Sequence, residues 1–467
     1  MNGPQEGQNS QGTEDVNMDQ DHDDPGETSI AQDTPENGEF IAEEDVVAEF
    51  QVGNEQDRMA DDDGDDDDDA VEDEDGGDGE DRVAVEDMAM ATFTGHSDAV
   101  YCVAANPKNP SQVATGGGDD KGFLWEVGKD GAIAASRELN GHSDSVASVG
   151  FSADGSFVAT GCYGGIVKVW ECSTGSLRHT LEGPEDIEWL TWHSLGSVLL
   201  AGSQDGTVWM WDAVAGTCMQ VFAGHEKKVS CGTFTSSGKA VVTGSDDGTV
   251  RVWAPRTGEC RHSFGGHGFH EGAVTCIARH PDPAQSPLIA TGGEDGTARV
   301  VHIQTKRVLG TMVHCQAEEG SVEAVGFCAS HPWVGTAATD GNLKVWDSVT
   351  GTCRHTCSHP GPVTNLEWHP SAPFAFTSCV DGSVRAWDAR TGTCDRVLTG
   401  HTDMILDLRL MDPLPWVQDG GVAPGMGASN DSAAGESDQA VAILTASDDH
   451  TSKVFFWSSL QAQKAQA

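Results

Sequence analysis

The residues of this sequence that could do chemistry are 18 His, 13 Cys and 75 Asp and Glu. No HExxH metal motif, no GxSxG nucleophile motif and no GxxxxGK[ST] phosphate loop occurs among them. The stretch 116–121, GGGDDK, has the composition of a phosphate loop but falls where a tight turn is expected. We therefore predict that the chain is not an enzyme, that it holds no metal ion, and that it needs no cofactor.

His and Asp recur instead at fixed spacing, in units of about 41 to 48 residues. A His that mostly follows Gly opens each of six units, and an apolar residue follows four positions later. A Trp closes six of the units, whereas Val301 and Phe455 close two others. An Asp stands six residues before most closing positions. The opening His are His96, His142, His225, His270, His359 and His401; the Asp are Asp119, Asp205, Asp247, Asp295, Asp340, Asp381 and Asp449; the Trp are Trp125, Trp170, Trp211, Trp253, Trp346 and Trp387.

Eight such units, rich in Gly turns and short apolar runs, predict many short strands rather than long helices. The pattern is similar to that of the WD repeat, and the likeness covers residues 88 to about 458. It implies an all-β fold, a single eight-bladed WD-repeat β-propeller. In that family the turn Asp accepts a hydrogen bond from the opening His, which reaches a Ser or Thr hydroxyl and the Trp indole. Thr160, Thr243, Thr291 and Thr377 stand at the hydroxyl position.

Three units depart from this pattern. The second has Gly164 where Asp is expected, and the third opens around Gly183 and Pro184 without a His. The sixth opens irregularly around His314. We expect the second and third networks to be incomplete.

The ends of the repeat region predict how the ring closes. In WD propellers the outer strand of a blade precedes the next Gly-His, so residues 85–93 should supply the outer strand of the closing blade. We therefore place the propeller at residues 85–460, with a flexible insert at 412–439 and a disordered C-terminus at 461–467. A closed ring protects sheet edges that would otherwise aggregate.

Charge is distributed unevenly along the chain, whose net charge is −49. Residues 1–90 hold 34 of the 75 acids against Arg58 and Arg82, so they carry −32. Residues 1–84 are too acidic and too poor in apolar residues to fold alone, and we predict a disordered acidic tail. This balance argues against direct nucleic-acid binding and favours a basic protein or peptide partner.

The compartment follows from what the sequence lacks. No apolar run is long enough to cross a bilayer, and the first residues do not resemble a signal peptide. We expect a cytoplasmic monomer without a membrane partner, and leave nuclear entry open. The cysteines show no CxxC pair, and Cys218, Cys260, Cys353 and Cys394 share one repeat position. We predict buried free thiols.

Acidic residues concentrate in the loops that WD propellers gather on one rim of the channel. They predict a negatively charged protein-binding face, with Trp189 placed to stack on an Arg. The alternative is that these acids are solvated turn residues without a binding role. The candidate binding residues are Asp98, Asp144, Glu185, Asp186, Glu188, Trp189, Glu323, Asp403 and Asp407.

Finer details resemble one family within the WD proteins. The GGGDDKGFLW closing of the first unit, the EGPEDIEW opening of the third and the DHTSKVF ending, together with the acidic start, are similar to the angio-associated migratory cell protein family. A fungal relative is a dedicated chaperone of one large-subunit ribosomal protein. The likeness implies capture of a basic segment of universal large-subunit protein sixteen for ribosome assembly. Two alternatives stay open: a signalling or migration scaffold, and a cullin-RING ligase substrate receptor, which the WD-x-R tetrapeptide ending at Arg390 suggests.

Overall fold

The computed structural model describes residues 86–285, 287–411 and 440–459. Within them lie 32 strands and one short 3-10 helix, η1 (Pro283–Gln285). The predicted acidic tail, the insert at 412–439 and the C-terminus at 461–467 lie outside the described residues.

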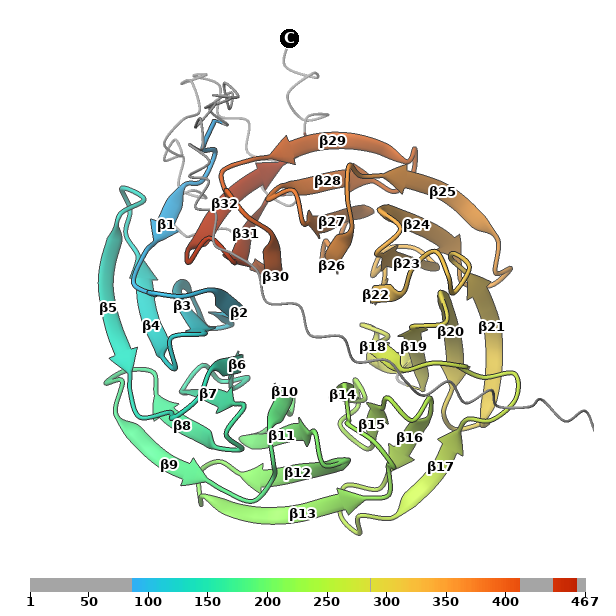
Figure 1. The fold of residues 1–467 in the computed structure, drawn as a ribbon, viewed down its shortest axis with the longest axis horizontal. Coiled ribbons are helices and arrows are strands. Elements are labelled where there is room, and N and C mark those ends of the chain that lie inside the picture. The colour runs from blue at the N-terminus through green and yellow to red at the C-terminus, as the bar shows by residue number, and fades with distance from the viewer. Residues whose placement is uncertain (1–85, 286, 412–439, 460–467) are drawn as a thin grey trace, which may run out of the picture. The chain divides into compact units, whose positions relative to one another are not determined.

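The strands form eight antiparallel sheets of four, arranged as blades around a central channel (Figure 1). This confirms the predicted all-β, eight-bladed propeller. From the channel outward, blades one to four are β2 (Val100–Asn106), β3 (Asn109–Gly117), β4 (Gly122–Val127), β5 (Ile133–Leu139); β6 (Val146–Phe151), β7 (Phe157–Cys162), β8 (Val167–Glu171), β9 (Leu177–Leu181); β10 (Ile187–Trp192), β11 (Val198–Ser203), β12 (Thr207–Asp212), β13 (Thr217–Ala223); β14 (Cys231–Phe234), β15 (Val241–Gly244), β16 (Val250–Trp253), β17 (Cys260–Phe264).

Blades five to seven continue in the same order, and blade eight takes its outermost strand from the start of the repeat region. Their strands are β18 (Val274–Arg279), β19 (Leu288–Gly293), β20 (Thr297–His302), β21 (Arg307–Val313); β22 (Val322–Phe327), β23 (Trp333–Ala338), β24 (Asn342–Asp347), β25 (Cys353–Ser358); β26 (Val363–Trp368), β27 (Phe374–Cys379), β28 (Val384–Asp388), β29 (Thr393–Leu398); and β30 (Ile405–Met411), β31 (Ala440–Ser447), β32 (Ser452–Ser458), β1 (Ala91–Phe93).

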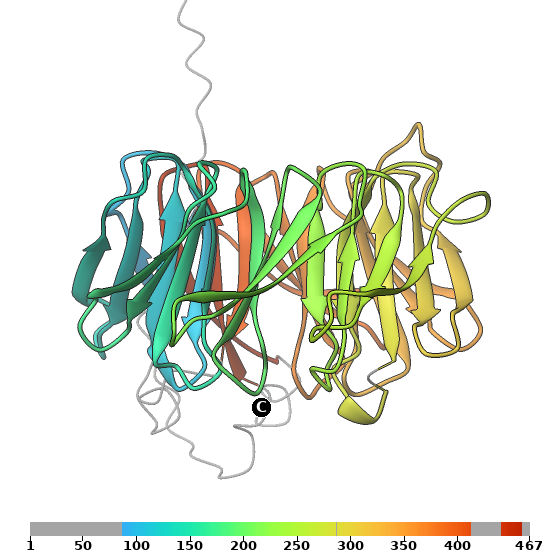
Figure 2. The same cartoon turned by 90° about the horizontal axis from the view of Figure 1, so that it is seen from below.

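The strands run between two faces of the ring (Figure 2). We call the top face the one that carries the loops from each outer strand to the next inner strand and the turns between second and third strands. The other turns form the bottom face. Because each blade packs on its neighbours, the second strands are buried on both sides: every residue of β23 and of β27 is buried, whereas most of β9 is exposed. The core therefore lies between the blades.

The ring closes by strand pairing between distant parts of the chain. β1 pairs antiparallel with β32, with Ala91 opposite Val454 and Phe93 opposite Ser452. The Phe93 ring stacks on Trp125 of blade one, with 5.0 Å between ring centroids. Lys453 Nζ donates to Asp87 Oδ2 at 2.6 Å. One short strand thus joins blade eight to blade one.

Two blades contain the complete chain of polar contacts from Trp to Asp. In blade four the Trp253 indole donates to Thr243, whose hydroxyl bonds to His225, and His225 Nδ1 lies 2.9 Å from Asp247. Blade six repeats this arrangement with Trp346, Thr336, His314 and Asp340, although its His ring is turned so that Nε2 faces the Asp at 3.3 Å. His314, whose unit opens irregularly in sequence, is a full member of its network.

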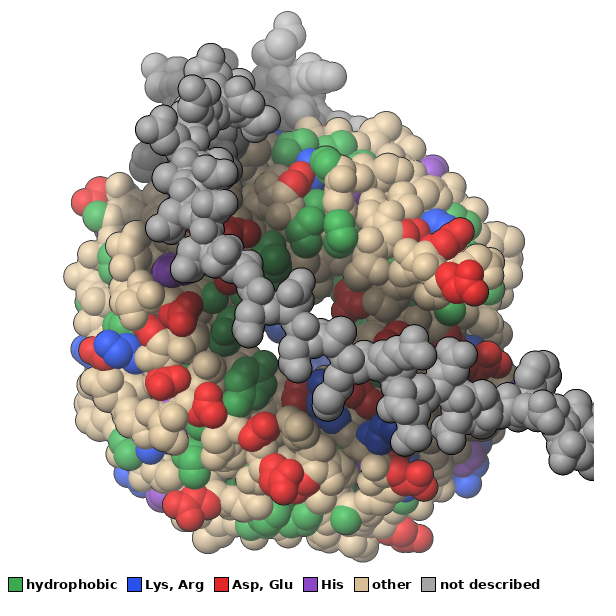
Figure 3. All heavy atoms as spheres, viewed as in Figure 1, with side chains coloured by type: hydrophobic (Ala, Val, Ile, Leu, Met, Phe, Trp, Pro, Cys, Tyr) green, Lys and Arg blue, Asp and Glu red, His purple; other side chains and the backbone are tan. Residues whose placement is uncertain are grey.

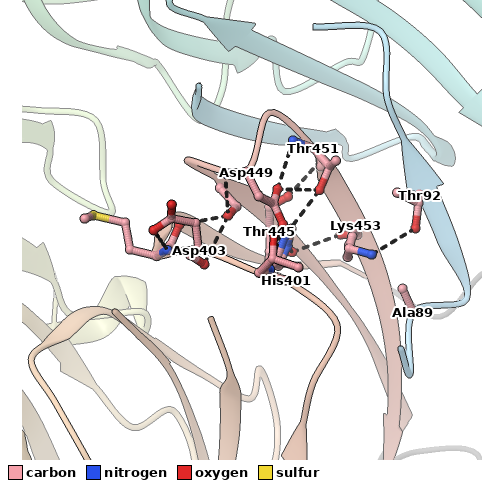
Figure 4. A network of polar contacts seen from close by, with 12 residues as sticks. Ala89, Thr92, His401, Asp403, Thr445, Asp449, Thr451 and Lys453 are labelled. Atoms are coloured by element: carbon pink, nitrogen blue, oxygen red, sulfur yellow. Dashed lines mark hydrogen bonds and ion pairs between the residues drawn. The ribbon is translucent and has the colours of Figure 1, made fainter. Parts of the chain in front are cut away.

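Blades one, five and eight keep the contacts of His with Thr and Asp but not the Trp contact. Trp125 Nε1 has no hydrogen-bond partner among the described residues, and Val301 and Phe455 have no indole to offer. Figure 4 shows the blade-eight network, in which His401 bonds to Thr445 at 2.7 Å and to Asp449 at 2.8 Å.

Blades two, three and seven lack the contact between His and Asp. His142 and His359 bond to their Thr hydroxyls, at 2.7 Å each, but within the described residues their Nδ1 atoms are buried without a partner. In blade seven the expected pairing is wrong: Asp381 binds Arg385 at 2.8 Å instead. Arg385, four residues further along the same hairpin, takes the carboxylate in this blade, whereas in blade five Asp295 binds both Arg299 and His270.

Blade three replaces the His with an aromatic ring. A Cβ on Gly183 would meet Trp209 at 2.4 Å, so this ring covers the site where the other blades open with His. The Trp209 indole donates to Thr207, which in turn donates to Asp205 at 2.6 Å. Trp211 is fully buried beside it.

Burial and hydrogen-bond partners together shift the pKa values of His142, His359 and Asp247. Burial lowers the pKa of His142 to about 4, with a further contribution from Lys168, and burial lowers the pKa of His359 to about 4, helped by Arg385. Burial alone would raise the pKa of Asp247, but hydrogen bonds from His225 and Thr249 outweigh it and hold that pKa well below its ordinary value. His142 and His359 are therefore neutral in the folded chain near pH 7.

The closing strand yields a prediction about stability. A chain that starts at residue 95 loses β1 and the Phe93 contacts, and removal of one buried Phe alone costs about 3–5 kcal/mol. A chain that starts at residue 81 keeps all of these contacts. Thermal melts of the two truncations should show a large loss of melting temperature for the first and little for the second; equal losses would contradict closure by β1.

Blade two yields a second prediction. A Cβ at Gly164 would have no neighbour closer than 3.5 Å, so an Asp fits there and can accept from the unpartnered His142 Nδ1. Gly164→Asp should stabilise the fold by about 1 kcal/mol. Because the pKa of His142 is depressed when folded, this His costs stability as pH falls from about 6.5 toward 4, and the new carboxylate should reduce that loss.

Denaturant unfolding between pH 8 and pH 4 measures both effects. Gly164→Ala is the matched control, since it has the same backbone effect without the carboxylate. If the Asp and Ala variants have the same stability at every pH, the blade network does not work as described.

Candidate protein-binding site

Three Asp residues occupy one repeated position on the top face. Asp98, Asp144 and Asp403 each stand two residues after an opening His, and all three are exposed. Each accepts a backbone N–H from the next residue, at 2.7 to 2.8 Å, which fixes the loop. They belong to blades one, two and eight, which are consecutive in the ring.

Blade three extends this row with Glu185, Asp186 and Glu188. Glu185 is exposed, and the other two are half-buried. Glu188 forms an ion pair with Lys228 at 3.4 Å. We call the six carboxylates from blades eight, one, two and three the acidic arc: Asp403, Asp98, Asp144, Glu185, Asp186 and Glu188. Within the described residues Glu188 is the one member in an ion pair, so the arc keeps most of its negative charge.

Glu323 lies away from the arc, on β22 of blade six, where it accepts a hydrogen bond from Ser321. Figure 3 looks onto the top face and shows acidic side chains around much of the ring and few Lys or Arg. The face is therefore predominantly negative.

Asp120 on the turn of blade one adds a carboxylate at a conformational cost. Its φ is +62°, in the left-handed region, whereas the same position is Gly206, Gly248 or Gly296 in other blades. His450 in blade eight makes the same exception, with φ +66°. Left-handed backbone is unfavourable for residues with a Cβ, so Asp120 is held there by its surroundings.

Two tyrosines lie within the arc, and sequence reasoning missed them. Tyr101 on β2 and Tyr163 after β7 are the only Tyr of the chain. Tyr163 is 39% exposed. Burial raises its pKa, and Glu188 and Tyr101 raise it further, which places these groups close together. A Cβ on Gly118 would lie 3.1 Å from the Tyr101 hydroxyl and 3.2 Å from Asp98, so ring and carboxylate are neighbours as well. The sequence did contain a signal for these two residues, because the whole chain has only two Tyr.

Asp407 is not on the exposed rim, contrary to expectation. It is buried at 8% exposure in the channel wall. Its carboxylate accepts from Val103 N of blade one at 3.1 Å and from Asn365 of blade seven at 3.0 Å. Burial raises its pKa, although Arg409 opposes that effect. Asp407 therefore joins three blades rather than facing a partner.

Trp189 likewise belongs to a joint between blades. Its indole N–H donates to Val229 O of blade four at 2.9 Å. A Cβ on Gly202 or on Gly232 would meet this ring at 2.3 Å, so both positions must be Gly for the ring to fit. A β-bulge at Glu188 turns the residue after it toward the neighbouring blade, and a bulge before Asp407 does the same. The expected stacking of Trp189 on a partner Arg is therefore not supported.

The remaining sequence features lie elsewhere. Arg390 of the WD-x-R tetrapeptide lies on the bottom face, where Nη2 binds Asp388 at 2.8 Å and the guanidinium covers Phe374.

All 13 cysteines are free thiols, but Cys218, Cys353 and Cys394 are exposed, because they start outer strands, and their predicted burial is wrong. In the described part of the chain, no group of three His, Cys, Asp or Glu is arranged for a metal ion, and no helix is long and apolar enough to cross a membrane.

The chain is similar in sequence to known proteins of two kinds, angio-associated migratory cell proteins and a ribosome assembly protein. The chain is 34% identical over 276 residues to angio-associated migratory cell protein of Homo sapiens, a match that covers 56% of this chain and 62% of the human protein. It is 30% identical over 155 residues to ribosome assembly protein SQT1 of Saccharomyces cerevisiae, covering 31% of this chain and 36% of that protein. The matched part is thus less than two thirds of either relative.

A solved structure shares the whole fold. Sqt1 of Chaetomium thermophilum, bound to the N-terminus of the ribosomal protein L10, superimposes with a TM-score of 0.65 and 22% identity, covering 79% of this chain and all of that one.

The family model described as WD domain, G-beta repeat, matches residues 89–126, 134–171, 175–212, 216–254, 258–302, 308–347 and 351–388. These segments are more than half of the chain, and each runs from the outermost strand of one blade through the first three strands of the next. The chain belongs to the WD repeat family.

Proposed function

We propose that this chain is a dedicated chaperone that captures a basic segment of a newly made large-subunit ribosomal protein on its top face. Following the resemblance seen in sequence, the client is universal large-subunit protein sixteen, held until it joins the assembling ribosome. The chain acts as a monomer and without catalysis. It works in the cytoplasm, where ribosomal proteins are made, and can accompany its client into the nucleus.

The acidic arc is the observation that carries this proposal. Its carboxylates lie on four consecutive blades around one mouth, so their fields add over a continuous surface instead of cancelling. A surface of this kind attracts Lys- and Arg-rich segments over a distance of about one Debye length, ~8 Å at physiological salt. Complementary charge raises the association rate and disfavours acidic competitors.

The tyrosines supply specificity for Arg. Tyr101 and Tyr163 offer aromatic faces beside Asp98 and Glu188. A guanidinium between them can stack on a ring and pair with a carboxylate at once, which an ammonium does less well.

The relatives support the same reading. The yeast relative is a ribosome assembly protein, and the Chaetomium chain with this fold binds the N-terminus of a ribosomal protein. These are properties of those proteins, and the arc is the feature of this chain that fits them.

Charge reversal tests the proposal. Replacement of Glu188, Asp144 and Asp403 by Lys should weaken binding of a peptide with the N-terminal sequence of universal large-subunit protein sixteen by roughly a hundredfold at low salt, because attraction becomes repulsion. Isothermal titration at two salt concentrations measures this effect. The control reverses Asp130, Glu171 and Glu259 on the bottom face, which changes net charge equally. The proposal fails if the two triple variants bind alike, or if neither differs from the unaltered chain.

Asp120 allows a finer test that leaves the arc intact. Asp120→Gly removes a carboxylate and relieves left-handed strain, so it should weaken peptide binding about threefold without lowering the melting temperature. His450→Gly relieves the same strain and leaves every carboxylate of the top face in place. If both variants bind the peptide as the unaltered chain does, Asp120 plays no part in the site.

A further inference from the structure

A pocket on the bottom face has the opposite charge to the arc. It measures about 270 Å³ and lies between the lower turns of blades four and five. Blade four supplies Lys239, Arg261 and His262, and blade five supplies Lys306. Val252, Ala240 and Ile303 contribute an apolar lining.

These cations have no carboxylate to balance them. No Asp or Glu is among the residues that line the pocket, and within the described residues Lys239, Arg261 and Lys306 form no ion pair. Residues 91–467 hold 24 Lys and Arg against 41 acids, so three cations without a carboxylate around one small pocket depart from the composition of the propeller. Burial and the nearby charge of Lys306 lower the pKa of His262, which shows that the lysine acts on this ring.

The backbone at Lys306 gives a second, independent observation. Its φ is +57°, at the turn between β20 and β21. The corresponding turns of five other blades place Gly there, at φ between 68° and 72°: Gly175, Gly216, Gly258, Gly351 and Gly392. A Lys at such a position costs conformational energy that Gly avoids, and strain of this kind is retained mainly where the side chain is used.

We propose that this pocket binds a phosphoryl group carried by a phosphoserine or phosphothreonine side chain of a partner. The compact grouping fits one dianion with three oxygens better than a run of separate carboxylates. The guanidinium of Arg261 can bind two of these oxygens in a fork, while Lys239 and Lys306 act as point charges. The site lies on the face opposite the arc, so it does not depend on the proposed chaperone function.

Lys306→Gly provides a sharp test, because it removes the charge and also restores the residue usual at this turn. The full chain is titrated with a short peptide that carries one phosphoserine, with its Ser and Glu versions, and with inorganic phosphate. The phosphopeptide should bind roughly tenfold more tightly than the Ser and Glu versions, and Lys306→Gly should lose that preference. The melting temperature of the variant should stay the same or rise.

Lys129→Gly is the matched control, since it removes one positive charge from the corresponding turn of blade one, on the same face. It should keep the preference for phosphoserine. The His262 ring resonance, followed by NMR, should shift on binding in the control and not in Lys306→Gly.

Three outcomes overturn the proposal. Equal affinities in the unaltered chain and in Lys306→Gly would remove the pocket from the binding event. Equal binding of the Glu and phosphoserine peptides would indicate a general acidic ligand. Inorganic phosphate that binds as tightly as the phosphopeptide would indicate a free anion rather than a modified partner.

Discussion

The pairing of β1 with β32 is the constraint on which the other features depend. Burial of the inner strands between neighbouring blades is the main interaction that holds the blades together. Every blade has a neighbour on both sides only when the last blade packs against the first. Three backbone pairs, the Phe93 ring on Trp125 and the Asp407 carboxylate across the channel wall make this joint. The acidic arc runs directly over it, from blade eight through blade three, so an open ring would separate Asp403 from Asp98.

The sequence predicted the number of blades and the strand order because each unit repeats one physical solution. A turn Asp and a closing aromatic residue each stand at their position in seven of the eight units, at nearly constant spacing, and chance does not produce that register. The loss of the Asp partner in blade two was also predictable, because Gly164 has no side chain to offer. His314 was harder to assign, since its unit does not open with the usual Gly-His pair.

A repeat pattern does not specify which of two possible partners a side chain binds, nor the register in which two strands pair. Several features of the structure depend on these two properties. Asp381 could bind either His359 or Arg385, and only the packed hairpin decides between them. Trp189 and Asp407 were expected at the channel mouth, but a bulge of one residue near the start of their strands turns them into the joints between blades. The same bulge occurs in the first strand of most blades. The sequence therefore gives the number of acidic residues near the start of these strands, but not which of them face the solvent and which lie between blades.

The two tyrosines of the arc have a practical consequence. Since the chain has no others, the entire phenol absorbance of the protein originates from one side of the channel mouth. A cation that settles beside Tyr163 must favour its phenolate and lower a pKa that burial and Glu188 now raise. Ultraviolet titration of the unlabelled chain thus reports occupancy of this face directly, and the thirteen indoles, which do not ionise in that range, contribute only a constant background.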